Sequence, residues 1–586
     1  MLSLLPFDAA TFTWLVGLTL LGPLLLAALL ARYPESGWLR GFSPLTVAPA
    51  LLLAFGPHQE VVFADLVLGV RFGVDGLAAV FLLFSGLLWG GAAWFGLPYL
   101  AHDQQRSRYT RFFLIAQAGN LGLILAQDIA TFYFCFALMS FASYVLVVHD
   151  GKPASQRAGR IYLSLALVGE VLQFIAFSII AMQVPDARLA DVPQAVAQSP
   201  HRDVLIVLLL AGLGVKAGLV PLHVWLPLAH PVAPTPASAV LSGAMIKAGL
   251  LGWLRFLPLG LVQVPTAGYV LIVLGLVGSL GGAVVGVTQR HPKAVLAYSS
   301  ISQMGLIILM VGVALVDSSA ARLVLTAAVL YAAHHALAKG ALFLGVGMAT
   351  AAPGGGKARA LVMAGCALAG LALAGAPWTS GMLAKTALKK VAALVPGEGA
   401  VVLGWLLSLG AVGTTALMAR FLIRLRALQM DPAQRHEVSA AIWWPWLTVL
   451  AAMVSVSWFA LPALIEPMAG KLLSWPKLGW PILVGLLGTA LVVAWRRHRA
   501  PVGEIAQGDV LGVAQRTAPL LQAAAEYAVR ALITARDLVH QAQVVVMDRS
   551  VRRARWLDHA EVHLAEFLSL GLVLLGLASL LFLSWL

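Results

Sequence analysis

The chain has 586 residues, of which 60% are hydrophobic and 11% are charged. Soluble globular proteins carry about 25% charged residues, so this composition excludes a soluble domain and indicates an integral membrane protein. The formal net charge is +14, and its distribution along the chain distinguishes nucleic-acid binding from membrane topology.

Apolar stretches of about 20 residues recur along the chain, and each is long enough for a helix to cross a hydrocarbon core. The first stretch, near Thr11 to Leu30, follows Asp8 and lacks a basic segment before it. We therefore expect it to remain in the protein and not to be cleaved as a signal peptide. The sequence predicts an all-α polytopic bundle of sixteen spans, the seventh and twelfth broken: 12–31, 43–56, 74–97, 110–127, 129–149, 160–183, 203–226, 235–258, 266–289, 293–315, 320–350, 361–395, 398–423, 440–464, 479–495 and 564–586.

Lysine and arginine gather on one side of these spans. Of 39 such residues, 26 lie in or beside the loops after odd-numbered spans, 9 in or beside the other loops and 4 inside spans. The positive-inside rule places the odd loops in the cytoplasm and both termini outside, which in a bacterial inner membrane is the periplasm. The excess charge is explained by topology and by contact with anionic lipid, so we expect no nucleic-acid partner.

Two spans combine a lysine with helix breakers. Lys216 precedes Pro221 in GLGVKAGLVPLHVWLP, and Pro377 precedes Lys385 in LAGAPWTSGMLAK. Proline interrupts a helix, and the backbone that it frees is tolerated at membrane depth only where it is buried or lines a cavity. The breaks lie five spans apart, which predicts two inverted five-helix repeats, spans 4–8 and 9–13, around a transport site. The alternative is that the prolines only kink two helices.

Five ionisable side chains lie deep inside apolar spans. A charge at the bilayer centre costs at least about 2.5 kcal/mol, so such a residue is a candidate for ion transfer. The alternative for each lysine is that its ammonium reaches the membrane interface, which we favour for Lys389 and Lys390 near a span end. The five residues are Glu170, Lys216, Lys247, Lys339 and Lys385.

Histidines extend this set. His335 and Lys339 are four residues apart and share a helix face, whereas His334 points elsewhere. His223 and His230 follow the first helix break. These two and His334 are candidates for proton entry, although His223 and His230 are equally compatible with structural hydrogen bonds in a loop.

Glu170 is the only carboxylate in the middle of a span. A lone buried carboxylate is either protonated or paired with a cation, and we expect Glu170 to pair with Lys216. Asp75, at the start of the third span, is expected at the membrane interface.

The C-terminal part follows another pattern. From about Gly508 to Leu557, charges alternate with apolar residues, which predicts an amphipathic helix about 70 Å long at the cytoplasmic surface. Such a helix can reach a neighbouring subunit, or it packs only on its own chain. The expected divisions are helices 1–3 (1–105), the two repeats (106–260 and 261–430), helices 14–15 (431–500), the lateral helix (501–560) and the final anchor (561–586).

Cofactor motifs are absent from the sequence. The two cysteines, Cys135 and Cys366, lie in separate predicted spans and form no CxxC pair, and no dinucleotide or P-loop motif occurs. We expect no redox cofactor, no metal and no catalytic residue for covalent chemistry.

Four segments resemble the antiporter-like subunits of respiratory complex I, Mrp sodium/proton antiporters and group 4 membrane hydrogenases. They are KAGLVPLHVWLPLAHPVAPTPASAVLSGAMIKAGL, HPKAVLAYSSISQMGL, HHALAKGALFLGVG and GAPWTSGMLAK. The likeness covers spans 3 to 13 and is greatest to the hydrogenase, or formate hydrogenlyase, branch. It implies two inverted repeats joined by a midplane chain of lysines, histidines and waters.

By this resemblance, Lys216, Lys247, His335, Lys339 and Lys385 match the family's positions on helices seven, eight, eleven and twelve. The family pattern also places a glutamate in the fifth span, in a context like WELMSLASY. This chain reads FALMSFASY and has Ala137 there. Glu170 is a candidate replacement, or else the first half-channel is altered.

These observations predict a proton-translocating subunit of a larger complex, driven by redox chemistry or an ion gradient elsewhere. One alternative is an energy-coupling partner of a cytoplasmic protein, as in inorganic-carbon uptake. Another is a subunit of an Mrp-type sodium/proton antiporter.

Overall fold

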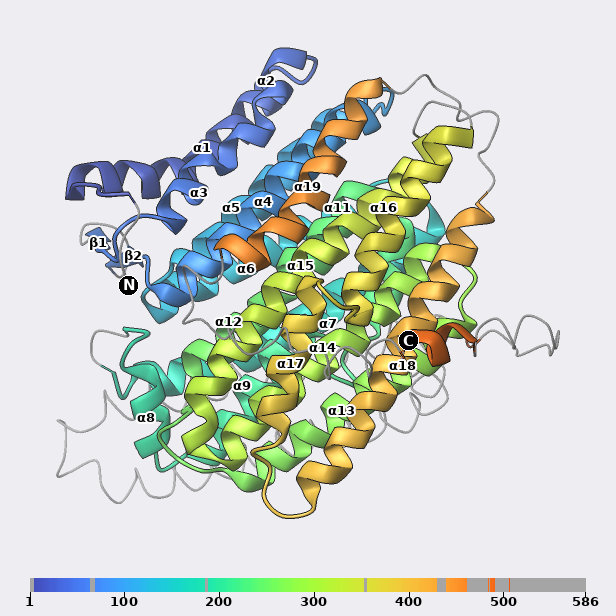
Figure 1. Ribbon diagram of the computed structural model, residues 1–586. Helices are drawn as coiled ribbons and strands as arrows, with labels where there is room; N and C mark the ends of the chain where they lie inside the picture. The colour runs from blue at the N-terminus through green and yellow to red at the C-terminus, as the bar shows by residue number, and fades with distance from the viewer. Residues whose placement is uncertain are drawn as a thin grey trace, which may run out of the picture.

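The computed structural model describes residues 5–63, 69–184, 188–351, 356–428 and 439–460, together with residues 483, 485–490 and 505. Long helices running side by side dominate this part of the chain (Figure 1). The N-terminal half contains α1 (Ala9–Arg32), α2 (Gly37–Gly41), η1 (Ser43–Val47), α3 (Ala48–Ala54), β1 (Glu60–Phe63), β2 (Val70–Gly73), α4 (Gly76–Tyr99), α5 (Arg106–Leu125), α6 (Ile129–Val147), α7 (Pro153–Ala181), α8 (Val192–Gln198), α9 (Arg202–Ala217), α10 (Trp225–Val232), α11 (Thr235–Val240), η2 (Leu241–Met245) and α12 (Lys247–Phe256). The C-terminal half contains α13 (Pro265–Thr288), α14 (Pro292–Val316), η3 (Ser318–Ala320), α15 (Ala321–Ala351), α16 (Gly356–Ala374), α17 (Ser380–Ala392), α18 (Gly399–Arg426), η5 (Ala440–Ile442), α19 (Trp443–Ser455) and η6 (Val456–Ala460).

Among the described residues, eleven helical segments are long and apolar enough to cross a membrane. This confirms the polytopic helical class. The predicted second span is different: residues 43–54 form η1 and the seven-residue α3, with a proline in the first turn of each. Proline fixes φ and removes a donor, so the segment folds as two short pieces. The lateral helix, the final anchor and most of the fifteenth span lie outside the described residues.

Two elements were not predicted. β1 and β2 form an antiparallel hairpin in which Glu60 is paired with Gly73. The short helix α8 lies between α7 and α9. Both belong to the connections between spans, and strands of 4 residues and a helix of 7 residues are too short to give a clear periodic signal.

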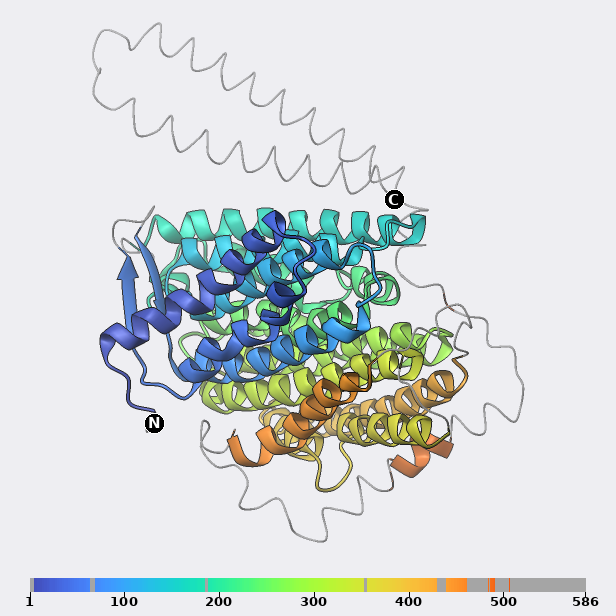
Figure 2. The same cartoon turned by 90° about the horizontal axis from the view of Figure 1, so that it is seen from above.

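The chain progresses across the bundle from α1 on one flank to α18 and α19 on the other (Figure 2). α15 lies in the interior and contacts α4, α11, α14, α16, α17 and α19. Every residue of α14 is buried. A helix without an exposed face cannot face lipid, so α14 and α15 form the centre of the bundle.

α13 and α14 approach closely through glycines. A Cβ placed on Gly275 would lie 2.5 Å from the carbonyl oxygen of Gly305, and one on Gly268 would lie 2.7 Å from that of Gly312. Small residues let membrane helices pack backbone to backbone. This contact fixes the position of α14 against its neighbour.

Both predicted helix breaks are confirmed. α9 ends at Ala217, and Gly218 has φ +76° before α10 begins at Trp225. α16 ends at Ala374, and Gly375 has φ +82° before α17 begins. Glycine reaches this left-handed conformation at little cost, so it ends each first segment cleanly. A further irregularity was not predicted: the five residues of η2 form a π-helical turn between α11 and α12.

Candidate functional site

Lys247 is the first residue of α12 and is completely buried. Its Nζ donates a hydrogen bond of 2.7 Å to the carbonyl oxygen of Ser242, which lies in the π-turn η2. π-turns occur often at functional sites. Here the turn places a backbone acceptor next to a buried ammonium.

Lys339 on α15 is also completely buried. Its Nζ donates to the carbonyl oxygen of Leu296 on α14 at 2.7 Å, and the Ser300 hydroxyl donates to the same oxygen at 3.0 Å. The Ser300 and Ser242 hydroxyls are 2.7 Å apart. We call Ser242, Ser300 and the Leu296 carbonyl the serine link, because together they connect the contacts of Lys247 with those of Lys339.

His335 lies one helical turn before Lys339 and is completely buried. It interacts electrostatically with Lys247, Lys339 and His334. Within the described residues, neither of its ring nitrogens has a hydrogen-bond partner from the protein. The shared face predicted for His335 and Lys339 thus lies beside Lys247, in the centre of the bundle.

His230 and Lys293 extend this cluster along α10 and α14. His230 is completely buried in α10, not in a loop, and its ring stacks on Phe343 with centroids 4.6 Å apart. It interacts electrostatically with Lys339, Lys293 and Lys247. Lys293 is 7% exposed and donates to the Ala233 carbonyl at 2.7 Å. Lys293 was not among the predicted site residues, because it lies at the edge of a predicted span. It is part of the segment HPKAVLAYSSISQMGL, which carries the family resemblance.

The second helix break holds a separate group. Nδ1 of His334 and the Ser380 hydroxyl are 2.7 Å apart, at the start of α17. The half-buried Lys385 donates to the carbonyl oxygen of Ala374, the last residue of α16, at 2.7 Å. A cation is favoured at a helix C-terminus, where carbonyl groups lack helical partners. His334 and Lys385 also interact electrostatically, so His334 faces this break.

Lys216 lies in an aromatic environment at the end of α9. It is 4% exposed, and its Nζ donates to the Tyr162 hydroxyl at 2.9 Å. The same atom is 5.6 Å from the ring centroid of Phe136, 5.0 Å from that of Tyr162 and 5.9 Å from that of Trp225. Cation–π contacts at these distances stabilise an ammonium without a carboxylate.

Glu170 on α7 is 4% exposed, so it does not face lipid. It interacts electrostatically with Lys216. However, the ion pairs among the described residues do not include the expected Glu170–Lys216 pair, and the Lys216 ammonium donates to the Tyr162 hydroxyl. A pocket of about 10 Å³ beside Lys216 is lined by residues including Ser140 and Gln173. That volume is about what one water molecule needs.

The remaining candidates lie at the ends of helices. His223 is 3% exposed in the connection between α9 and α10. Asp75 caps α4, accepting from the Ala78 amide at 2.8 Å, and forms a bidentate ion pair with Arg255. Its expected place at the end of the span is confirmed. Burial opposes ionisation of Asp75, but the Arg255 charge and the hydrogen bonds together hold its pKa below the usual value.

Known proteins and a family model are similar to this chain. Residues 126–409 match the family model described as NADH:quinone oxidoreductase/Mrp antiporter, TM. The matched segment covers just under half of the chain.

Hydrogenase-4 component B of Escherichia coli (strain K12) is 33% identical over 307 residues, which cover 51% of this chain and 45% of that protein. Among solved structures, the Mrp complex from Dietzia sp. DQ12-45-1b matches with a TM-score of 0.69 and 23% identity, over 97% of this chain and 63% of that chain. The membrane-bound sulfane sulfur reductase, an archaeal respiratory membrane complex, matches with a TM-score of 0.66 and 21% identity, over 95% and 99% of the two chains. The chain spans about half the length of the curated relatives that it matches. The two solved structures establish the fold.

The chain departs from the resembled pattern at Ala137. This residue is half-buried on α6, one turn before Ser140, whose carbonyl accepts from the Tyr162 hydroxyl at 3.0 Å. A tyrosine thus contacts Lys216 where the family pattern provides a carboxylate. Tyr162 was not predictable from the sequence, since its contact with Lys216 depends on how α7 packs against α9.

Candidate metal ligands were sought among the described residues. Across the described ranges, no group of three or more His, Cys, Asp or Glu side chains could hold a metal ion. Cys135 and Cys366 are both free thiols.

Proposed function

We propose that this chain is a proton-translocating, antiporter-like subunit of a larger energy-converting membrane complex of the complex I or group 4 hydrogenase type. The observation that carries the proposal is the serine link between two fully buried lysines, Lys247 and Lys339. Its partners in the complex supply the driving force, through redox chemistry or an ion gradient.

Within the serine link, the Ser242 and Ser300 hydroxyls can pass a proton between them because a hydroxyl both donates and accepts hydrogen bonds, while the carbonyl oxygens of Ser242 and Leu296 hold the two ammonium groups beside them. Two ammonium groups repel strongly in a low-dielectric interior. A proton that arrives on one lysine therefore favours release from the other. His335 interacts electrostatically with both lysines, and water at its ring nitrogens would satisfy a buried polar group and extend the path.

We place the entry and exit at the two helix breaks. His230 and Lys293 lead from the cluster toward the start of α14, on the side where basic residues gather. His334 and Lys385 lead toward the break between α16 and α17. His230, Lys216 and Glu170 lie in the first proposed repeat, 106–260, and Lys293, His334 and Lys385 lie in the second, 261–430.

The setting of the subunit is also a proposal. The excess of lysine and arginine after odd-numbered spans supports a bacterial inner-membrane protein with both termini in the periplasm. The amphipathic segment 501–560 is proposed as the lateral helix that contacts neighbouring subunits.

A charge-removing substitution tests the function. Lys247→Met keeps the length of the side chain but removes its proton site, and we expect inverted vesicles containing the whole complex to lose the share of their pH gradient that this subunit contributes. Lys357→Met, at an exposed position near the start of α16, is the matched control. A normal gradient with Lys247→Met in an assembled complex contradicts the proposal.

A further inference from the structure

A cavity whose lining includes no lysine lies between α2, the start of η1 and the adjoining ends of α4 and α5. Its volume is about 270 Å³. Ala93, Gly96, Leu97 and Phe113 give it apolar walls, while Arg40 and Arg106 line it with guanidinium groups. Apolar walls with a cationic rim match an amphiphilic ligand.

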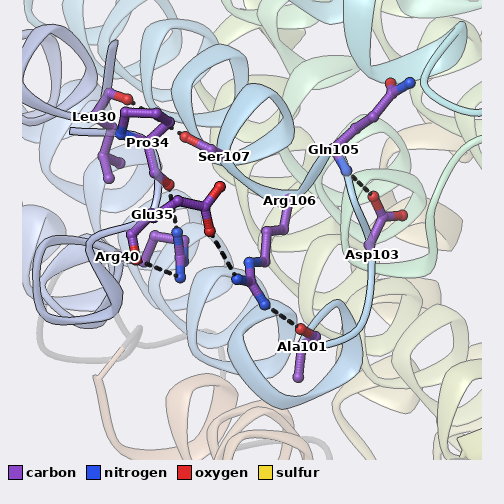
Figure 3. Close-up of polar contacts among 9 residues, drawn as sticks. All are labelled: Leu30, Pro34, Glu35, Arg40, Ala101, Asp103, Gln105, Arg106 and Ser107. Atoms are coloured by element: carbon purple, nitrogen blue, oxygen red, sulfur yellow. Dashed lines mark hydrogen bonds and ion pairs between the residues drawn. The ribbon is translucent and has the colours of Figure 1, made fainter. Parts of the chain in front are cut away.

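The two guanidinium groups are held in position by loop oxygens (Figure 3). Arg40 donates to the Pro34 carbonyl at 2.6 Å and to the Glu35 carbonyl at 3.4 Å. Arg106 donates to the Ala101 carbonyl at 2.5 Å and to the Glu35 carboxylate at 3.1 Å. Each guanidinium has five N–H donors, so donors remain for a further acceptor.

The charges at this cavity are not balanced. Partial burial is the larger cause that lowers the pKa of Arg40, and the nearby charge of Arg106 is the smaller one. Arg40 and Arg106 thus bring two positive charges to the same cavity. Among the ion pairs of the described residues, the Glu35 carboxylate is the one anion that pairs with either arginine. It pairs with Arg106, and the Glu35 side chain is 83% exposed. A mobile surface carboxylate forms a weak ion pair, which an external anion can displace.

The position of the cavity identifies the source of that anion. It lies at the end of the bundle where α1 ends and α5 begins, the side with the excess of basic residues. Trp38, beside it on α2, is 72% exposed, and tryptophan is enriched at the level of lipid headgroups. Basic pockets between membrane helices on this side bind anionic headgroups.

We propose that this cavity binds an anionic phospholipid, with the phosphate on Arg40 and Arg106 and part of an acyl chain against Ala93, Leu97 and Phe113. Planar guanidinium groups recognise phosphate oxygens through paired hydrogen bonds. Glu35 competes with the phosphate for Arg106. This site is independent of the proposed proton path.

The test is native mass spectrometry of the full chain released from nanodiscs that contain phosphatidylglycerol and phosphatidylcholine. We expect wild type to retain phosphatidylglycerol preferentially, and Arg40→Gln and Arg106→Gln each to retain about fivefold less. Glu35→Gln should retain more, because it removes the competing carboxylate. Lys152→Gln, on the same side with its side chain 76% exposed, is the matched control and should not change retention.

Gly96→Leu separates a lipid site from a site for free phosphate. A Cβ on Gly96 would meet only ordinary contacts, the nearest at 3.8 Å, so a larger side chain enters the cavity without forcing the backbone apart. It leaves both arginines in place and should reduce lipid retention. Unchanged retention in both arginine variants, an equal loss in Lys152→Gln, or full displacement of lipid by millimolar inorganic phosphate would overturn the proposal.

Discussion

Removing the Ser300 hydroxyl should interrupt proton transfer between Lys247 and Lys339. In Ser300→Ala, the Ser242 hydroxyl loses a partner 2.7 Å away, and the Leu296 carbonyl loses a donor 3.0 Å away. Leaving a buried polar group unsatisfied costs about 1–3 kcal/mol. If that cost raises the barrier to transfer, the rate falls about 5- to 150-fold, since about 1.4 kcal/mol corresponds to a factor of ten.

The assay is the initial rate of fluorescent pH-gradient formation in vesicles that carry the assembled complex. Ser299→Ala is the matched control, because the neighbouring Ser299 hydroxyl is buried but has no hydrogen-bond partner in the described part of the chain. The double variant Ser242→Ala with Ser300→Ala should be no slower than the more affected single variant, as expected for two residues in one path. A wild-type rate in Ser300→Ala, or an equal loss in Ser299→Ala, refutes the argument.

Three other predictions concern charge and packing. Asp75→Asn keeps a capping side chain but loses the ion pair, so it should be less stable than wild type by about 1 kcal/mol or less near neutral pH. Because the folded-state pKa of Asp75 is lowered, this difference should shrink as the pH falls through that pKa in melting curves, and a pH-independent difference would count against it. Gly275→Val should destabilise the fold by about 1–3 kcal/mol, since its Cβ would meet backbone at 2.5 Å, while Gly281→Val, with nothing within 4 Å, should melt near wild type. Glu170→Gln should slow proton uptake, with recovery when Ala137→Glu is added; normal uptake in the single variant would show that Glu170 has no role.

Features that depend on residues close together in the sequence were predictable. Pro221 and Pro377, each near a glycine and a lysine, identified both helix breaks, because proline and glycine act on their own backbone. The burial of Lys247 and Lys339 followed from the apolar residues around them. Both predictions depend on residues that are adjacent or nearly adjacent in the sequence.

Contacts between distant segments were not predictable in this way. Ser242 and Ser300 are 58 positions apart, and their contact requires the π-turn η2 to face α14. Tyr162 reaches Lys216 across 54 positions, and this contact replaces the ion pair expected with Glu170. Single-sequence patterns report which face of a helix is apolar but not which neighbour meets it.

The central claim is that protons cross this chain through the buried lysines. It is tested most directly by pH-gradient formation in proteoliposomes containing the whole complex with Lys339→Met. We expect the Lys339→Met complex to assemble normally and its pH gradient to fall by the share that this subunit contributes. A full gradient from an assembled Lys339→Met complex would contradict it.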